Sequence, residues 1–290
     1  MSRNFMNIGA KATLIISVYK NIAFLRVVLD SLKHQTEQAF ELIISEDGQD
    51  EAMRTFIQNY PFSQPFLHLT QPDIGWNKCA ALNNAVRKAN ADWLIFIDED
   101  CVLHPRFVEM HLRYARPDRM LMGKRVKLNA ALSEILMGDV CASSKVERAL
   151  FKMLLTGKKQ GTKAVEEGFF VNPDGLLGFL PPLRKKRRLI GSNMSFAKSA
   201  LMRINGFDES YRKPTVGEDT DLKWRLEAIG VEPFSVCWLA VQYHLYHPES
   251  WDEETNRANK SVMFANMEQG LFFCKDGMEK EQSLPKKQVR

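Results

Sequence analysis

Two carboxylates stand two residues apart directly after an apolar run. Asp98 and Asp100, with Glu99 between them, follow residues 93–97, a run with the length and apolar character of a buried strand. Magnesium and manganese prefer oxygen ligands and commonly bind through one or two carboxylates together with substrate phosphates. The segment therefore predicts a divalent metal site to which both Asp98 and Asp100 contribute.

A second group of acids opens a predicted helix. Glu218, Asp219 and Asp221 follow Gly217 and precede apolar residues at helical spacing. Acidic side chains in a first turn complement the helix dipole, and aspartate is a good N-cap, so capping explains part of the cluster. Capping does not explain three acids directly after a glycine, and a catalytic role therefore stays open beside it.

A pair of histidines ends an apolar run near the C-terminus. His244 and His247 lie three residues apart in a chain that has only six histidines. A single histidine beside an aromatic strand is usually a hydrogen-bonded core group, but imidazole is also a common metal ligand. The close pair favours metal ligation by at least one of the two.

The elements that must position these groups follow from the apolar pattern of the N-terminal half. Short apolar runs, each followed by a polar end, occupy residues 12–18, 40–45, 65–70 and 93–97. Helical patterns at 22–34, 50–59 and 77–90 separate them. Strands that alternate with helices predict an α/β fold with a mostly parallel sheet and right-handed crossovers. In such sheets ligands bind at the carboxyl ends of the strands.

Acidic residues follow three of these four strands. Tyr19 comes after the first, Glu46 and Asp47 at the end of the second, Asp73 after the third, and the Asp98 segment after the fourth. An edge this acidic repels an anionic ligand unless a cation lies between them. A divalent metal and a phosphate-bearing ligand are therefore predicted together.

The remaining chain is divided by its pattern. Residues 130–189 loosen into one helix, a stretch rich in glycine and lysine, and a basic cluster, and we expect an irregular lid insertion there. Regularity returns with a strand at 191–196, a helix at 219–228 and a strand at 234–241, before a polar helical segment after residue 250. We expect one domain over 1–250, made of an N-terminal half (12–128), the insertion (130–189) and a second half (190–250), and an extension over 251–290.

Composition and charge limit the cellular setting. The five cysteines form no CxxC pair, no apolar run is long enough to span a bilayer, and the first eleven residues lack a signal-peptide pattern, so a cytoplasmic protein is expected. The net charge is +5, with consecutive basic residues from Arg184 to Arg188. This cluster is either a solvated loop or a peripheral contact with the anionic inner face of a membrane. Binding to nucleic acid is not expected, because no aromatic platform accompanies the cluster.

The ordered set of motifs resembles the family 2 glycosyltransferases with the GT-A fold, from about Thr13 to His247. In chain order the motifs are Ser17-Val18-Tyr19, Glu46-Asp47-Gly48, Asp73-Ile74-Gly75-Trp76-Asn77-Lys78, Asp98-Glu99-Asp100, Gly191-Ser192-Asn193, Gly206-Phe207-Asp208-Glu209 and Gly217-Glu218-Asp219. The resemblance implies a GT-A type fold, with a Rossmann-like, mostly parallel central sheet flanked by helices. It also implies that the domain over 1–250 is a glycosyltransferase domain, in which 12–128 is the nucleotide-binding half and 190–250 the acceptor-side half.

The resemblance also implies where a nucleotide diphosphate sugar binds. Asp47 would hydrogen-bond the base beside the turn at Val18 and Tyr19, while Asp98 and Asp100 would meet the ribose and the metal. Many relatives carry an arginine where this chain has Leu82, so a phosphate contact is expected from Lys78 instead. The other residues expected at the donor are Glu46, Asp73, Glu99 and Asn193.

By the same resemblance, Asp219 is the catalytic base and Glu218 touches the acceptor or the donor sugar. A histidine beyond that helix completes the shell of a Mn²⁺ or Mg²⁺ ion. His247 matches the spacing of galactosyltransferase-type members best, and His244 is also placed to contribute. The two other expected ligands of the ion are Asp100 and Asp98.

The implied reaction is direct displacement with inversion at the anomeric carbon. The donor is expected to be a UDP-sugar, and the acceptor a saccharide or glycolipid in cell-surface polysaccharide assembly. Processive synthases carry a QxxRW motif that this chain lacks, so transfer of single sugars is expected. A nucleotidyltransferase would need a glycine-rich loop after the first strand, which is missing. A non-catalytic carbohydrate- or nucleotide-binding protein on the same fold is the remaining alternative.

Overall fold

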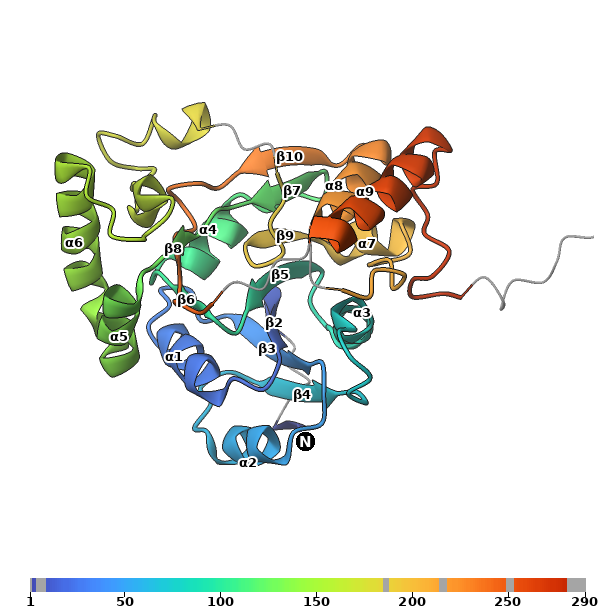
Figure 1. Ribbon diagram of the computed structural model, residues 1–290, viewed down its shortest axis with the longest axis horizontal. Coiled ribbons are helices and arrows are strands. Elements are labelled where there is room, and N and C mark those ends of the chain that lie inside the picture. Colours follow the sequence, from blue (N-terminus) through green and yellow to red (C-terminus); the bar gives the residue numbers. More distant parts are fainter. Residues whose placement is uncertain (1, 4–8, 185–187, 214–217, 249–252, 281–290) are drawn as a thin grey trace, which may run out of the picture.

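A computed structural model describes residues 2–3, 9–184, 188–213, 218–248 and 253–280. Its centre is a mixed sheet with helices on both faces (Figure 1). In spatial order the strands of this sheet are β1 (Ser2–Arg3), β4 (Phe66–Thr70), β3 (Phe40–Glu46), β2 (Ala12–Val18), β5 (Trp93–Asp98), β9 (Met194–Ala197), β7 (Arg119–Met122) and β10 (Glu232–Ser235). A smaller sheet has the order β6 (Cys101–Leu103), β11 (Gln242–His244) and β8 (Val126–Lys127).

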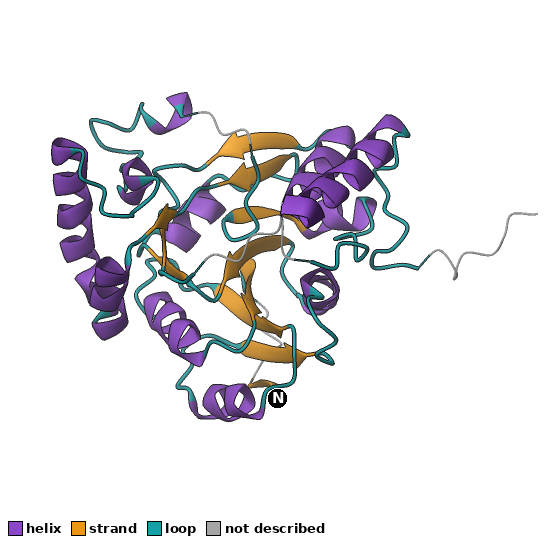
Figure 2. Cartoon of the chain, viewed as in Figure 1, coloured by secondary structure: helices purple, strands orange, loops and turns teal. Residues whose placement is uncertain are grey.

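Helices cover the sheets and form most of the periphery (Figure 2). They are α1 (Ile22–Leu32), α2 (Glu51–Asn59), α3 (Lys78–Lys88), α4 (Phe107–Arg113), α5 (Ala130–Gly138), α6 (Ser143–Thr156), α7 (Lys198–Arg203), α8 (Glu218–Ala228) and α9 (Glu253–Glu268), with short 3₁₀ helices η1 (Val140–Ala142), η2 (Val165–Gly168) and η3 (Pro181–Leu183). In Figure 1 α5 and α6 lie at one end of the molecule and α7, α8 and α9 towards the other.

The parallel part of the sheet confirms the alternating pattern of the N-terminal half. β2, β3, β4 and β5 run parallel, and β2, β3 and most of β5 are buried, as expected of strands covered on both faces. Two of the crossover helices begin at side-chain caps, where Asn21 accepts from the backbone of Phe24 at 3.1 Å and Asp50 accepts from that of Met53 at 2.7 Å. The predicted α/β fold with a mostly parallel sheet is confirmed.

The order of these strands creates the place where a ligand can bind. The chain proceeds from β2 outward through β3 to β4, then returns through α3 to β5 on the other side of β2. Between strands whose connections leave in opposite directions, the carboxyl ends open a crevice. This switch point lies between the ends of β2 and β5, and therefore beside Tyr19 and Asp98.

Of the segment predicted as one strand at 234–241, only residues 234–235 are in a strand, at the end of β10. β10 ends at Ser235, a turn in which Trp238 has a positive φ of 64° follows, and β11 begins at Gln242. The apolar run alone could not reveal this break, because its residues are buried in the turn as well. The break delivers β11 to the small sheet, next to the end of β5.

The insertion over 130–189 is more regular at its start than the sequence predicted. α5 and α6 pack on the small sheet around a second apolar core, which includes Leu136, Leu150, Val126 and Tyr243. The following segment, up to Arg184, consists of turns and the short helices η2 and η3. None of the helices in the described ranges has the length and apolar character that crossing a bilayer requires.

Candidate active site

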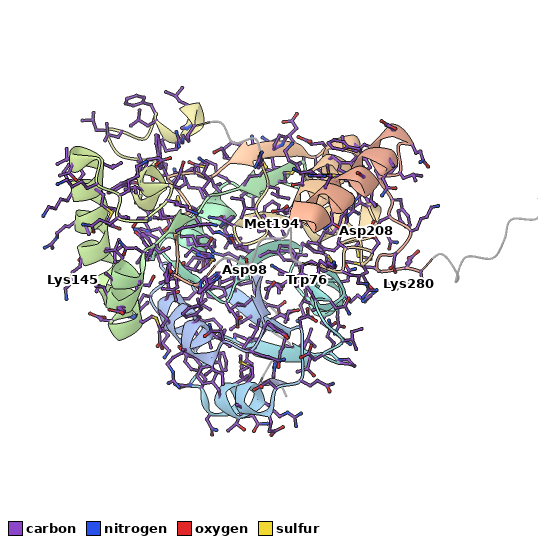
Figure 3. The ribbon with its side chains drawn as sticks, viewed as in Figure 1. Trp76, Asp98, Lys145, Met194, Asp208 and Lys280 are labelled. Atoms are coloured by element: carbon purple, nitrogen blue, oxygen red, sulfur yellow. The ribbon has the colours of Figure 1, made fainter. Side chains whose placement is uncertain are left out.

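A pocket of about 470 Å³ opens at the switch point of the sheet. Its walls come from the ends of β2, β3 and β5 and from the first turns of α3. Figure 3 shows Asp98 and Trp76 near the middle of the molecule, and both side chains line the pocket. Six residues predicted to bind the donor line it, namely Val18, Tyr19, Asp47, Lys78, Asp98 and Glu99.

Asp98 at the end of β5 is surrounded by positive charge. Lys78 Nζ donates to its Oδ1 at 2.6 Å, and Arg125 Nη1 lies 3.5 Å from its Oδ2. Arg125 also donates to Ser192 Oγ at 2.8 Å. Arg125 was not predicted from the sequence, although it follows the carboxyl end of β7 in the same way as the acids follow their strands. Two cations beside the pocket can attract the phosphates of a ligand.

Asp100 lies between two histidines. The Nε2 atoms of His244 and His247 are both 3.1 Å from Asp100 Oδ2, and one ligand atom from each of the three residues lies within 4.8 Å of the others. The register places His244 opposite Cys101, so β11 itself brings this histidine to the end of β5. The structure thus gathers three of the four predicted metal ligands, while the fourth, Asp98, faces Lys78 and Arg125 instead.

The ionised state of Asp100 suits a cation, whereas protonation of His247 opposes one. Burial alone would raise the pKa of Asp100, but hydrogen bonds from His244 and His247 outweigh it, and the pKa lies well below its usual range. The hydrogen bond to Asp100 raises the pKa of His247. An ionised carboxylate and two imidazoles form a donor set for a divalent metal. Because two of its three donors are nitrogen, the set is less suited to Mg²⁺, which prefers oxygen.

Asp219 lies in the first turn of α8, near the pocket residue Lys78. Its carboxylate accepts a hydrogen bond from Thr220 Oγ1 at 3.3 Å and others from the backbone of Thr220 and Gly191. Burial raises its pKa, and those hydrogen bonds and the charge of Lys78 oppose the shift only in part. A carboxylate with a raised pKa is a stronger base than an exposed one. The side chain of the other predicted catalytic residue, Glu218, lies outside the described ones.

Asp221 in the same helix has a structural role. It accepts from Arg225 Nε at 2.6 Å and from Trp224 Nε1 at 3.0 Å, and both members of the Asp221–Arg225 pair are buried. Arg225 in turn donates to the backbone carbonyls of Ile204 and Gly206. Helix packing therefore accounts for Asp221, whereas Asp219 takes no part in the contacts with Trp224 and Arg225.

Hydrogen bonds of Asp47 and Glu99 hold parts of the pocket wall in place. Asp47 accepts from Gln71 Nε2 at 2.6 Å and from the backbone of Asn77 at 2.7 Å, which fixes the loop before α3. Glu99 accepts from the backbone of Tyr19 at 3.0 Å. Burial, reinforced by the charge of Asp100, raises the pKa of Glu99 to about 8. This raised pKa favours the protonated, uncharged form of Glu99.

Three predicted donor-binding residues do not line the pocket, and two of them, Glu46 and Asp73, have charged partners elsewhere. The buried carboxylate of Glu46 contacts His68 Nε2 at 2.7 Å and accepts from the backbone of Asp50 at 2.8 Å, so it organises the start of α2. Successive strand residues point to opposite faces, which turns Glu46 away from the side where Asp47 lies. Asp73 pairs with Lys20 Nζ at 2.6 Å outside the pocket lining.

Asn193 is likewise placed inside the protein, away from the pocket lining. Its Nδ2 donates to the carbonyls of Lys124 and Ala240 at 2.8 and 3.0 Å, and its Oδ1 contacts His111 Nε2 at 3.1 Å. These three contacts engage both the nitrogen and the oxygen of the Asn193 side-chain amide. The structure corrects the sequence interpretation, because Asn193 joins the ends of β7 and β9 to the turn before β11 rather than facing a ligand.

Gly123 is required by this packing of Asn193. A Cβ atom at residue 123 would lie 2.2 Å from the Asn193 amide, so we expect Gly123→Ala to lower the free energy of unfolding by about 1–3 kcal/mol. Urea denaturation measures this, with Gly138→Ala in α5 as the control, since a Cβ there meets nothing within 4 Å. Equal stability of Gly123→Ala and the unchanged protein would contradict the packing described for Asn193.

Arg184, the first residue of the basic cluster, is paired with acidic side chains of this chain. Arg184 forms an ion pair with Glu167, has Glu166 at 3.6 Å, and stacks over the ring of Trp238 at 5.1 Å. Residues 185–187 lie outside the described part of the chain. The predicted membrane contact thus gains no support from Arg184, whose charge is directed towards two acids.

Known proteins with the same architecture define the class. A mannosyltransferase of Pyrobaculum calidifontis, solved with GDP-Man and Mn²⁺, superposes with a TM-score of 0.52 and 16% identity over 91% of this chain and 65% of its own. S. aureus TarS (residues 1–349), solved with UDP, gives a TM-score of 0.58 and 12% identity over 89% and 65%. The fold is therefore of the GT-A glycosyltransferase type.

Sequence comparison gives the family. The sequence model of glycosyl transferase family 2 matches residues 13–160, just over half of the 290 residues, and the chain belongs to this family. It is 25% identical to the chondroitin synthase of Escherichia coli over 96% of this chain and 27% identical to that of Pasteurella multocida over 88%. The chain spans only 41% and 26% of the length of these two relatives.

Proposed function

We propose that this chain transfers a sugar from a UDP-sugar to a hydroxyl of a saccharide acceptor, with the help of a divalent metal and with inversion, in the assembly of a polysaccharide. The observation that carries the proposal is the meeting of Asp100, His244 and His247 at the edge of a pocket that Asp98 and Lys78 also line. The names of the relatives, which include two chondroitin synthases and a hyaluronan synthase, support the polysaccharide product.

The metal would be held by Asp100, His244 and His247. When bound, it would offset the negative charge that builds on the leaving diphosphate. Lys78 and Arg125, which lie beside Asp98, would add positive charge on the other side of the same group. Mn²⁺ is the proposed ion because of the two imidazole donors, and a solved neighbour also contains Mn²⁺.

Asp219 would accept the proton of the attacking hydroxyl. Its raised pKa and its place near Lys78 put a base close to the diphosphate end of the pocket, where the anomeric carbon of a bound donor must lie. Attack from the side opposite the leaving group inverts that carbon. A base needs hydrogen-bond reach of the proton that it removes, and the acceptor hydroxyl would therefore lie beside the first turn of α8.

UDP is proposed as the nucleotide because Asp47 and the turn at Val18 and Tyr19 line the far end of the pocket, and TarS binds UDP in a related fold. Nucleotide release should be measured with a panel of UDP-, GDP-, CDP- and TDP-sugars and with Mn²⁺, Mg²⁺ or a chelator. We expect slow release of UDP from one sugar donor, with Mn²⁺ most effective and no release with chelator. If the folded protein binds none of these donors, the chain is a non-catalytic member of its family.

A further inference from the structure

Helix α6 carries large apolar side chains on both of its sides. On the inner side, Val146 and Leu150 are buried in the second apolar core. On the outer side, Phe151, Leu154 and Leu155 are 56%, 44% and 73% exposed. Single exposed apolar residues are common on protein surfaces, but three at one end of a helix form a patch. In the described part of the chain this patch remains open to solvent.

The same outer side of α6 is basic. Phe151 and Lys152 follow Arg148 by three and four residues, and Leu155 continues this face of the helix. Lys145 lies one turn earlier, and Figure 3 shows it at the outer edge of the molecule. All of these side chains are exposed. Cations and apolar groups therefore share a face about 15 Å long, at a rise of 1.5 Å per residue.

The positive charge of this face is not balanced by acids of the chain. The exposed residues between 144 and 161 include no aspartate or glutamate. Glu147, which is partly buried, accepts a hydrogen bond from Tyr243 OH at 2.9 Å. The basic side chains form no ion pair with any residue in the described ranges. They are Lys145, Arg148, Lys152, Lys158 and Lys159.

Helix stability does not explain the basic residues within α6. Lys145 lies in the first turn, which contains no acid, and a positive charge there opposes the helix dipole. Arg148 and Lys152 are four residues apart and repel each other. Only Lys158 and Lys159, which follow the end of the helix, complement the dipole. Negative charge from outside the chain would offset both unfavourable effects.

We propose that the outer face of α6, together with the turn up to Lys159, docks on an anionic lipid surface. Anionic headgroups attract lysine and arginine, and exposed apolar side chains enter the boundary between headgroups and acyl chains. A soluble polyanion would pair with the cations but would leave Phe151 and Leu155 in water. This face does not include Arg184, so the contact differs from the one predicted from the basic cluster.

Docking through α6 would also connect the membrane surface to the candidate active site. The hydrogen bond between Glu147 and Tyr243 joins α6 to β11, the strand that carries His244. The proposal does not depend on the transferase function, because binding to vesicles is measured without donor or acceptor.

The test is sedimentation of the full chain with vesicles of phosphatidylcholine alone or of phosphatidylcholine and phosphatidylglycerol in equal parts. A charge variant and an apolar variant change α6, and one matched control for each changes exposed residues of α9, which lies towards the other end of the molecule. The α6 variants are Arg148→Gln/Lys152→Gln and Phe151→Gln/Leu155→Gln, and the controls are Arg257→Gln/Lys260→Gln and Phe264→Gln/Met267→Gln.

We expect the unchanged chain to bind the anionic vesicles at least about tenfold more tightly than the neutral ones, and each α6 variant to lose about tenfold in that affinity. The α9 controls should bind like the unchanged chain. No preference of the unchanged chain for anionic vesicles, or equal losses in the α9 controls, would overturn the proposal. A loss in the charge variant alone would also overturn it, because the partner would then be a soluble polyanion.

A gain of signal guards against variants that simply fail to fold. Brominated lipid in the anionic vesicles should quench Phe151→Trp more than it quenches the unchanged chain with its five tryptophans. Phe264→Trp on α9 should show no such increase. Equal quenching of Phe151→Trp and the unchanged chain would exclude insertion of this face into the lipid.

Discussion

Replacing Asp219 by asparagine is expected to slow sugar transfer by about 10²- to 10⁴-fold, the range over which a positioned general base contributes. The amide has the shape of the carboxylate but cannot take the proton of the acceptor. Because Asp219 is not among the residues that line the donor pocket, the affinity for UDP-sugar should change little. The loss should therefore appear in kcat, as measured by product formation at saturating donor.

The pH dependence of the transfer rate is a second test of Asp219 as the base. Burial raises the pKa of Asp219, and a base is active only when deprotonated. The rate of the unchanged enzyme should therefore fall as the pH drops through this raised pKa, and the residual rate of Asp219→Asn should not show that step. If Asp219→Asn is slower than the unchanged enzyme but its rate still falls over the same pH range, another group is the base.

Glu227→Gln is the matched control for Asp219→Asn. Glu227 lies on the same helix, α8, where it pairs with Lys223 at its exposed side. An exposed pair of this kind contributes little to stability, so this variant should keep both its fold and its transfer rate. Equal activity of Asp219→Asn and Glu227→Gln would refute the assignment of Asp219 as base.

Removing Asp100 is expected to abolish most of the metal binding. Asp100→Ala takes away the carboxylate that lies between His244 and His247. Its effect should exceed the roughly 10- to 100-fold loss of affinity that removal of an outer-shell partner causes. Mn²⁺ titration by calorimetry, with and without UDP, measures this directly, and His247→Ala should weaken binding as well.

Asp92→Asn is the control for the loss of a carboxylate from the same part of the chain. Asp92 is exposed immediately before β5, at the opposite end of the strand from Asp100, and its removal should leave the Mn²⁺ affinity unchanged.

Metal binding should also weaken as the pH falls through the raised pKa of His247, because only the neutral imidazole is a ligand. Retained Mn²⁺ affinity in Asp100→Ala would exclude this cluster as the metal site.

Much of the site was predictable because strand ends can be recognised locally. The apolar runs of β2 and β5 each end where polar residues begin, and those residues meet at one edge of the sheet since parallel strands share their carboxyl ends. Hence Tyr19, Asp98 and Asp100 were assigned to one site without any structure. The histidines were also predicted as ligands, although the sequence could not indicate which of the two lies closer to Asp100, and the structure places both at 3.1 Å.

The errors arose where a polar side chain finds its partners within the protein. Asn193 and Glu46 occur in the expected motifs, but His111, Lys124 and Ala240 surround the first, and His68 and Asp50 surround the second. These contacts join residues between 4 and 82 positions apart. Their existence depends on how the strands align and on which face each side chain leaves.

The sequence by itself determined the alternation of strands and helices and the acidic edge of the sheet, because apolar periodicity and the residues at strand ends act over short stretches of chain. Only the tertiary structure decided what each acid faces. The break between β10 and β11 carries His244 to Asp100, and the bridge between Lys127 and Lys163 joins the segment after α6 to the small sheet. Both depend on pairing between distant segments, whose register is set by burial of the whole sheet face and not by any local pattern.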